Sequence, residues 1–413
     1  MRLIYNIFIF IYLLLIKVAA LFNQKARLWV DGRKNIRYTI RQIDSGNKPV
    51  IWIHAGSLGE FEQGRPIIEA MRDEIPGVFI VLTFFSPSGY EIRKNYDGAG
   101  KILYLPIDTP SNAAFFVREI KPVLAIFIKY EFWFNYLKVL NQNSIPIFFV
   151  SAIFRLGQHF FKPWGGWFRA QLRNIDWFFV QHQPSLELLK NIGVSNATVS
   201  GDTRFDRVFS IARNARILPA IRSFKNDKKL LVAGSSWPED EELFINAWLP
   251  FSDQLKLIIA PHEVHSERIE KLAASHGYKC IKYSEIDKSV PSEANILIID
   301  SIGILSSIYQ YADIVYIGGG FGKGIHNILE AATFGSPIFF GPNYLKFQEA
   351  VELIVAGGAF SVTTSAGLES HIKNYLENPE KQNETAKICR DYVASHIGAT
   401  AIVMAKIKQV LQS

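Results

Sequence analysis

The sequence predicts an α/β protein built from two Rossmann-like domains that follow a short apolar helix. The chain has 413 residues, more than one ordinary hydrophobic core and enough for two domains of about 200 residues each. Short apolar runs alternate with helical segments in both halves, as expected of parallel sheets that are covered on both faces. Residues 3–22 are apolar apart from Asn6 and Lys17.

The composition argues against long disordered segments and points to an anionic partner. Hydrophobic residues make up 49% of the chain and aromatic residues 13%, which is typical of well-packed domains. The two cysteines, Cys280 and Cys389, offer neither a disulfide framework nor metal-ligand spacing, which suits a reducing compartment. The net charge of +7 fits nucleic acid, an anionic membrane or a phosphorylated substrate, so the location of the charge must decide.

Residues 1–24 are predicted to form a membrane anchor. The apolar stretch is close to the lower limit of about 20 residues for a membrane span, and Lys17 can snorkel to the interface. Only Arg2 precedes the stretch, whereas six basic residues follow it: Lys25, Arg27, Arg33, Lys34, Arg37 and Arg41. This asymmetry predicts that the body of the protein lies in the cytoplasm. The alternative is a cleaved signal peptide ending near Val18-Ala19-Ala20, which the charge of Lys17 disfavours.

Residues 25–210 are expected to form the first domain. Its predicted strands are the apolar runs 50–54, 79–83, 123–128, 146–150 and 177–180, with helical segments such as 64–74 and 111–120 between them. Ligands of such sheets bind beyond the carboxyl ends of the strands. Polar residues that follow those ends are therefore the first candidates for a site.

Two strand ends carry acidic residues. The first strand runs into Gly56-Ser57-Leu58-Gly59-Glu60, a tight turn that delivers Glu60 to the start of the next helix. The simpler interpretation is a first-turn glutamate that complements the helix dipole. The third strand runs into Glu131-Phe132-Trp133-Phe134-Asn135, where Glu131 is a candidate site residue or a structural hydrogen-bond acceptor at the strand end.

An aromatic and basic segment occupies residues 159–173. Its rings alternate with Lys162, Arg169 and Arg173, a pattern that could stack nucleic-acid bases, lie at a lipid interface or pack into a core. Because an apolar leader is already present, the lipid interface is favoured and nucleic acid is not expected as a partner.

The second domain is expected over residues 230–413, after a basic linker at 211–229. The linker loses the strand signal and ends in the turn-forming run Asn226-Asp227-Lys228-Lys229. Strands are then predicted at 230–234, 257–260 and 296–299, and a helical segment at 381–412 closes the chain.

The glycine-rich stretch between Tyr316 and Pro342 is the most informative part of this domain. An apolar strand at 312–317 leads into five glycines, a helix predicted over 325–334 ends at Gly335, and 337–340 forms the next strand. Such a βαβ unit presents backbone N–H groups to a phosphate. The glycines match neither G-x-G-x-x-G nor a Walker A loop, so a dinucleotide site and a P-loop are disfavoured. The simpler alternative is a glycine turn that carries a solvated Glu330.

The run His326-Asn327-x-x-Glu330, followed by Gly335-x-Pro337 and Gly341-Pro342, resembles the donor loop of GT-B glycosyltransferases. It is most similar to that of the bacterial Kdo transferases, which move 3-deoxy-D-manno-octulosonic acid (Kdo) from its CMP ester to the lipid A precursor. The turn Ser57-x-Gly59-Glu60 resembles a second motif of this family. The resemblance implies a GT-B fold with the active site between the domains, CMP-Kdo and a lipid A precursor as partners, and the cytoplasmic face of the inner membrane as location.

The resemblance also implies roles for individual residues. It makes Glu60 the catalytic base. The acceptor-binding residues would be Ser57, Gly59, Glu131 and Arg155, and the donor nucleotide would contact Ser235, His262, Gly320, Gly322, Lys323, His326, Asn327 and Glu330. No metal site and no cofactor are expected, because no carboxylate cluster stands at a strand end.

The chain departs from the family pattern in its second half. Trp237 stands where relatives usually carry a histidine, and Pro261-His262-Glu263 lacks the usual arginine. Two alternatives therefore stay open. One is another membrane-associated GT-B enzyme that uses a UDP-sugar, and the other is a protein that binds nucleotide sugars or lipid without turnover.

Overall fold

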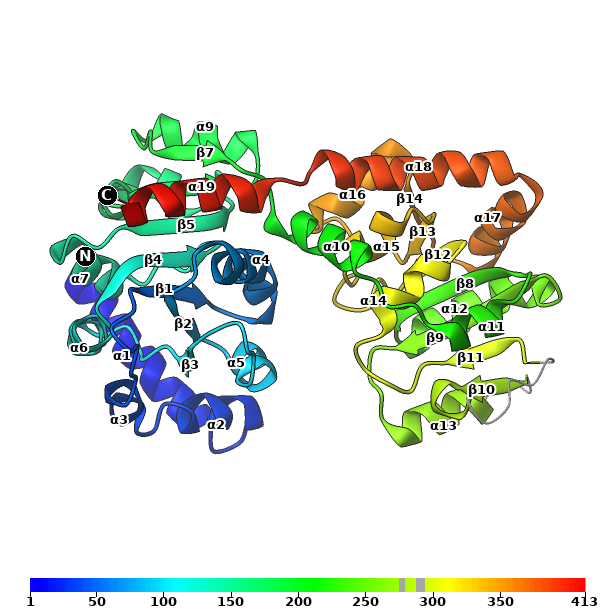
Figure 1. Ribbon diagram of the computed structural model, residues 1–413, viewed down its shortest axis with the longest axis horizontal. Coiled ribbons are helices and arrows are strands. Elements are labelled where there is room, and N and C mark those ends of the chain that lie inside the picture. Colours follow the sequence, from blue (N-terminus) through cyan, green and yellow to red (C-terminus); the bar gives the residue numbers. More distant parts are fainter. Residues whose placement is uncertain (275–278, 287–293, 413) are drawn as a thin grey trace. The chain divides into compact units, whose positions relative to one another are not determined.

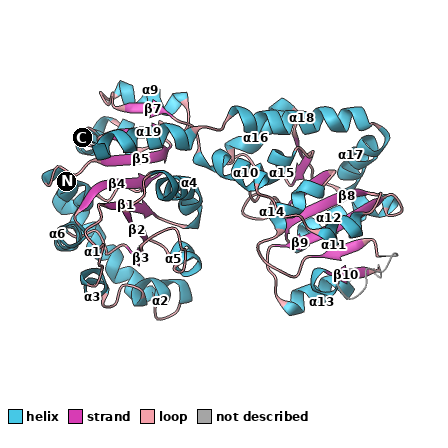
Figure 2. Ribbon diagram, viewed as in Figure 1, coloured by secondary structure: helices cyan, strands magenta, loops and turns pink. Residues whose placement is uncertain are grey.

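The computed structural model describes residues 1–274, 279–286 and 294–412, and the chain divides into two compact units. Unit 1 comprises Met1–Asp206 together with Ile397–Ser413, and unit 2 comprises Arg207–His396. Each unit is a parallel sheet of seven strands, with helices on both faces (Figures 1 and 2). The prediction of two Rossmann-like domains is confirmed.

Unit 1 has the strand order β3-β2-β1-β4-β5-β6-β7. Its strands are β1 Val50–Ala55, β2 Phe79–Phe84, β3 Lys101–Tyr104, β4 Pro122–Ile128, β5 Ile147–Ala152, β6 Trp177–Val180 and β7 Ala197–Val199. Its helices are α1 Arg2–Ala19, α2 Gln24–Asp31, α3 Ile36–Arg41, α4 Leu58–Glu74, α5 Pro87–Arg93, α6 Pro110–Ile120, α7 Phe134–Gln142, α8 Gly166–Leu172, α9 Gln183–Asn191 and α19 Ala399–Gln412, and α10 Thr203–Arg213 contains the unit boundary. Successive residues of β1 pack into opposite cores, Trp52 into one and Ile51 and Ile53 into the other, which explains the continuous apolar runs.

Unit 2 has the strand order β10-β11-β9-β8-β12-β13-β14. Its strands are β8 Lys229–Ser236, β9 Leu255–Pro261, β10 Cys280–Lys282, β11 Ile296–Ile298, β12 Ile314–Ile317, β13 Ile338–Phe340 and β14 Ala359–Ser361. Its helices are α11 Pro219–Lys225, α12 Pro238–Trp248, α13 Ser266–Ala274, α14 Leu305–Ile308, α15 Leu329–Phe334, α16 Gln348–Ala356, α17 Ser365–Glu377 and α18 Pro379–Ser395.

The four strands that the sequence did not reveal, β3, β7, β10 and β14, all lie at the edges of their sheets. An edge strand is covered less completely than a central one, so it can be short and polar and needs no long apolar run. The central strands are covered on both faces and are therefore continuous apolar runs. Most of their ends were predicted within one or two residues.

The prediction of a linker at residues 211–229 was wrong. The segment contains α11, whose Ile221 and Phe224 are fully buried in unit 2. The amide of Leu218 donates to the Tyr311 hydroxyl at 2.8 Å. Lys225 and Lys229 pair with Asp313 of the same unit at 2.7 and 3.2 Å, whereas Arg222 is exposed. The basic composition of the segment therefore did not reveal the apolar face of α11.

The carboxyl-terminal segment was predicted within residues 230–413, although in the GT-B enzymes that the chain resembles such a helix often crosses back to the first domain. Residues 381–412 form two helices instead of one, and the second, α19, belongs to unit 1. Its Val403 and Ile407 are buried in the same core as Phe61 of α4. The Asp206 carboxylate accepts hydrogen bonds from the amides of Gly398 (2.6 Å) and Thr400 (2.7 Å), and so caps the start of this helix.

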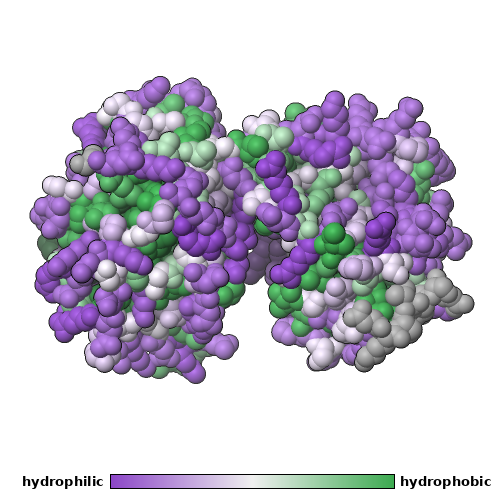
Figure 3. All heavy atoms as spheres, viewed as in Figure 1, coloured by the Kyte–Doolittle hydropathy of each residue, from purple (hydrophilic) through white to green (hydrophobic). Residues whose placement is uncertain are grey.

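Helix α1 is long and apolar enough to cross a membrane, with a mean hydropathy of 1.9. One of its faces lies against unit 1. The Tyr5 hydroxyl donates to Asp108 at 2.6 Å, and the Asn135 amide donates to Asn6 at 2.9 Å. The other face exposes apolar side chains that include Leu3, Ile4, Ile7, Phe8, Ile11, Leu14, Leu15 and Val18. This contrasts with the face of the molecule in Figure 3, where hydrophilic residues cover most of both units.

The lipid-interface interpretation of residues 159–173 was wrong for most of its rings. Phe160 is 1% exposed and packs on Phe132 with ring centroids 4.9 Å apart. Trp167 packs on Phe134 at the same distance, whereas Trp164 is 65% exposed. Two short 3₁₀ turns and α8 fold these rings onto the core, so the core-packing alternative holds.

Candidate functional site

In unit 1, Ser57 and Glu60 lie at the carboxyl end of β1, where α4 begins at Leu58. Ser57 is the N-cap residue in an extended conformation, yet its hydroxyl makes no cap hydrogen bond. It donates instead to the carboxylate of the half-buried Glu60. Glu60 is therefore held by a side-chain hydroxyl at the strand end, and the capping-box arrangement that this spacing allows does not form.

Glu131 lies at the same strand end, where its carboxylate occupies the space that a side chain at Gly56 would fill. A Cβ atom on Gly56 would lie 2.6 Å from the carboxyl carbon of Glu131, so any other residue would displace this carboxylate. The Trp133 indole N–H donates to Glu131 at 3.2 Å. Gly56 was not predicted as a site residue. Its position directly after a buried strand could have indicated it.

The fully buried His54 completes this arrangement. Its Nδ1 lies 2.8 Å from the Thr83 hydroxyl, and its Nε2 accepts from the Trp133 indole at 3.0 Å. Since an indole N–H can only donate, Nε2 carries the lone pair and the ring proton sits on Nδ1. His54 is thus a neutral ring whose Nε2 is 3.6 Å from the Glu131 carboxylate. His54 and Glu131 both accept from the Trp133 indole. This shared donor fixes the orientation of the His54 ring and of the Glu131 carboxylate.

Tyr130 lies near three of the predicted site residues. Burial raises the pKa of Tyr130, Glu60 and Glu131 raise it further, and Arg155 lowers it. Glu60, Glu131 and Arg155 therefore lie within electrostatic range of one hydroxyl. Gly59 is exposed, and a Cβ there would come no closer than 3.8 Å to Ser57 Oγ, so its role in binding stays a prediction.

In unit 2, the glycine loop between β12 and α15 folds onto itself. The amides of Gly322 and Gly324 both donate to the carbonyl of Gly319, at 3.1 and 3.2 Å. These two amides are therefore paired within the loop. Lys323, between them, is exposed.

The loop is anchored by residues outside it. A Cβ on Gly320 would lie 2.5 Å from the Gly341 backbone, so two chain segments touch here. The Asn343 amide donates to the carbonyl of Gly320 at 2.9 Å. The buried Asp240 carboxylate accepts from the Gly319 amide at 2.8 Å and from the Tyr316 hydroxyl at 3.0 Å. Asp240 and Asn343 have no signal in the loop sequence, because they come from other elements.

The helix after the loop is shorter than predicted. It begins at Leu329, not Ile325, and Ile325 and Ile328 before it are buried. Asn327 precedes the helix, accepts from the Leu329 amide at 3.1 Å and donates to Glu330 at 3.2 Å. The two side chains are therefore paired, although Asn327 lies outside the helix. A helix of six residues also adds little dipole to the loop.

Three rings stack beside the loop. The Trp237 indole N–H donates to His326 Nε2 at 3.1 Å. The exposed His262 stacks on His326 with centroids 4.3 Å apart and on Trp237 at 4.9 Å. Burial, followed by the charge of His262, lowers the pKa of His326 to about 4. His326 is therefore neutral near pH 7, with its proton on Nδ1, where it can donate to a ligand.

Ser235 and Lys346 adjoin the same loop. Ser235, with a φ of 54°, is half-buried and its carbonyl lies against Gly318. The ammonium of Lys346 donates to the carbonyl of Lys323, which places two lysines at the loop. Lys346 was not predicted. Within residues 1–274, 279–286 and 294–412, no group of three or more His, Cys, Asp or Glu side chains could hold a metal ion.

Residues 33–207 match a family model described as 3-deoxy-D-manno-octulosonic-acid transferase (kdotransferase). A protein of this name from Rickettsia bellii is 27% identical over 84% of this chain and 84% of its own length. Another from Aquifex aeolicus is 27% identical over 80% of this chain and 86% of its own length.

Solved structures share the fold at low identity. A UDP-GlcNAc 2-epimerase from Neisseria meningitidis is 15% identical, with a TM-score of 0.60 over 87% of this chain and 100% of its own. MurG from Acinetobacter baumannii is 16% identical, with a TM-score of 0.54 over 88% and 99%. These likenesses confirm the GT-B-like architecture and say nothing about substrates.

Proposed function

We propose that this chain, which belongs to the 3-deoxy-D-manno-octulosonic acid transferase family, transfers this sugar from CMP-Kdo to a lipid A precursor. Family membership makes it a glycosyltransferase. The observation that carries the finer proposal is the pair of carboxylates, Glu60 and Glu131, placed at the carboxyl end of β1 inside the matched region.

Glu60 takes the proton of the attacking acceptor hydroxyl. As the acceptor oxygen bonds to the anomeric carbon, the bond from that carbon to the CMP phosphate breaks, and the proton moves to the carboxylate. The Ser57 hydroxyl aims this carboxylate. Glu131, held by Trp133 and by the space above Gly56, binds the acceptor together with Arg155.

Unit 2 holds the CMP group. Asn327 and Glu330 provide paired polar side chains for the nucleoside, and the neutral His326 donates from Nδ1. Lys323, Lys346, His262 and the Ser235 hydroxyl lie beside the loop, where they support the negative charge that grows on the leaving phosphate. Lys346 thereby supplies a cation that the run Pro261-His262-Glu263 lacks.

We infer that α1 holds unit 1 at the cytoplasmic face of the inner membrane. Its polar contacts with Asp108 and Asn135 favour a helix that lies along the protein, with the opposite apolar face in the lipid. A lipid acceptor is thereby brought to the enzyme.

A transfer assay with radiolabelled CMP-Kdo and purified lipid A precursor in detergent tests this proposal. Labelled lipid should form with the parent chain and not with Glu60→Gln. Turnover of a UDP-sugar in place of CMP-Kdo, or binding of CMP-Kdo without any product, would overturn it in favour of the two alternatives.

A further inference from the structure

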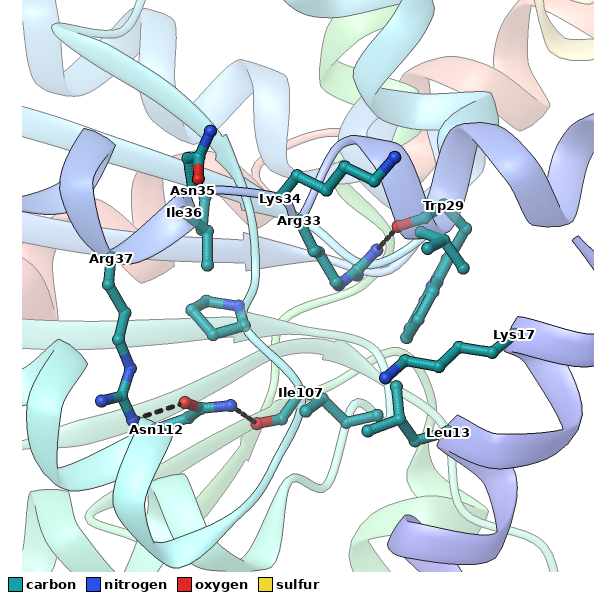
Figure 4. Close-up of a pocket in the computed structure, with 12 residues that line it drawn as sticks. Leu13, Lys17, Trp29, Arg33, Lys34, Asn35, Ile36, Arg37, Ile107 and Asn112 are labelled. Carbon is teal, nitrogen blue, oxygen red and sulfur yellow. Dashed lines mark hydrogen bonds between the residues drawn. The ribbon is translucent and has the colours of Figure 1, made fainter.

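Unit 1 also contains a pocket that shares no residue with the candidate functional site. It has a volume of about 560 Å³ and lies between α1, the segment joining α2 to α3, and the loop from β3 to α6 (Figure 4). Its lining residues are Leu13, Lys17, Trp29, Val30, Arg33, Lys34, Asn35, Ile36, Arg37, Pro106, Ile107 and Asn112.

The pocket is apolar inside and basic around its edge. Trp29, Pro106 and Ile107 are buried, and Leu13 extends from α1 on one side. Lys17, Lys34 and Arg37 are exposed. Among the described residues that line the pocket, four are Lys or Arg and none is Asp or Glu. A ligand with an apolar part and a negative charge matches this distribution.

The four cations are not equally available to a ligand. Arg33 is structural, since it donates to the carbonyls of Leu105 at 2.9 Å and Phe85 at 2.7 Å. Burial lowers its pKa to about 9. Arg37 donates to the Asn112 side chain at 2.9 Å.

The two lysines are freer. Among the residues that the structure describes, Lys34 pairs only with the exposed Asp31, at 2.7 Å, a contact that solvent weakens. The described part of the chain provides no ion-pair partner for Lys17, whose ammonium group points into the pocket from the last turn of α1 (Figure 4). Lys17 and Lys34 are therefore the groups that an anion would engage.

The pocket lies beside α1, the helix that also carries the exposed apolar face. Leu13 lines the pocket, and its neighbours Leu14 and Val18 are each 52% exposed. We propose that the pocket binds the phosphate head of an anionic membrane phospholipid through Lys17 and Lys34, with its acyl chains along α1. Free phosphate would leave the apolar floor unfilled. This inference rests on the proposed membrane position of α1 and is independent of sugar transfer.

Native mass spectrometry of the full chain in a nonionic detergent tests the proposal. Phosphatidylglycerol and phosphatidylcholine with identical acyl chains are the probes, and glycerol 1-phosphate is the competitor. One phosphatidylglycerol should bind in preference to phosphatidylcholine, and glycerol 1-phosphate should not displace it. Lys17→Gln/Lys34→Gln should weaken phosphatidylglycerol binding roughly 30-fold, as expected for two lysine contacts with an anionic lipid, while Lys17→Arg/Lys34→Arg should restore it.

Lys25→Gln/Lys138→Gln is the matched control, because both lysines are exposed, lie outside the pocket and carry the same total charge. Equal loss in this control, or equal binding of the two lipids, would refute the pocket as a specific site. Displacement by glycerol 1-phosphate would assign it to free phosphate, and saturable binding of lipid A precursor alone would assign it to the acceptor. Each of these outcomes contradicts the proposal without affecting the transfer assay.

Discussion

The carboxyl ends of the two sheets differ in chemistry although both units are seven-stranded parallel sheets. In unit 1 this edge carries two carboxylates, Glu60 and Glu131, held by a serine hydroxyl and an indole N–H. In unit 2 it carries a glycine loop with a neutral histidine and two lysines beside it.

The comparison shows how one architecture supports two tasks. A carboxylate that is held by neutral donors keeps its capacity to accept a proton, which suits general-base catalysis. Imidazole N–H and ammonium groups suit a phosphate. The anchoring also differs: unit 1 positions side chains, whereas unit 2 positions a backbone loop through Asp240 and Asn343. Five predictions sharpen or break this division.

The largest effect is expected for Glu60→Gln. This variant keeps the size of the side chain but cannot take a proton, so turnover should fall by on the order of 10² or more, with CMP binding nearly unchanged. A transfer assay and calorimetry of CMP binding measure the two quantities. Glu62→Gln, on the same helix and paired with Arg93 at 2.9 Å, should keep near-parent turnover. A folded Glu60→Gln protein with at least about a tenth of parent turnover would end the case for Glu60 as the base.

In unit 2, Glu330→Ala should act on binding. Loss of a polar contact to the nucleoside and of the pair with Asn327 should weaken CMP binding by about 1 to 3 kcal/mol. Calorimetry measures this loss, with Glu384→Ala, an exposed glutamate on α18, as the control. Unchanged CMP affinity in Glu330→Ala would remove Glu330 from the nucleotide site.

Gly56→Ala tests the packing of the unit 1 site. The added methyl group would lie 2.6 Å from the Glu131 carboxyl carbon, so the carboxylate must move away. Because only the end of a flexible side chain shifts, stability should change little, whereas turnover should fall roughly 10- to 100-fold. Gly59→Ala, whose Cβ would have no atom closer than 3.8 Å, should be neutral or stabilising, because alanine is favoured in a helix. Urea unfolding measures the stability of both variants and a transfer assay measures turnover. Parent-like turnover in Gly56→Ala would contradict the close approach of Glu131.

The pH dependence of stability tests the neutral His326. Its pKa of about 4 in the folded chain is below the ordinary value of 6.5, so the unfolded chain binds more protons between these values. The stabilisation by neutral His326 is fully present above pH 6.5 and is lost as the pH falls towards 4. The urea midpoint should therefore fall less in His326→Gln than in the parent between about pH 7 and about pH 4.5. Parallel curves would show that His326 does not titrate in this way.

The smallest effect is expected from chelation. If lysines and imidazole in unit 2 support the leaving phosphate, then EDTA should leave transfer unchanged. Loss of activity in EDTA that Mg²⁺ restores would show instead that the carboxylates of unit 1 or a substrate phosphate depend on a divalent ion. Radiolabel transfer with and without the chelator measures this directly.

Local sequence patterns located most of the candidate site. Glu60 and Glu131 follow buried strands, and polar residues at such positions lie at the ligand edge of a parallel sheet. The sequence also showed the glycines of the loop, but it did not predict the direction of their N–H groups. Gly322 and Gly324 turn inward to Gly319, because contacts with Asp240 and Asn343 from distant parts of the chain decide how the loop closes.

The sequence by itself determined the two α/β domains, the central strands and the apolar helix, because period and burial are recorded in consecutive residues. The tertiary structure alone decided that residues 211–229 pack on unit 2 and that α19 returns to unit 1. It also buried Phe160 and placed the Trp133 indole between His54 and Glu131. These outcomes depend on contacts between residues far apart in the chain. The sequence of an amphipathic helix or an aromatic run predicts that its apolar face is buried, but it does not predict which surface buries it.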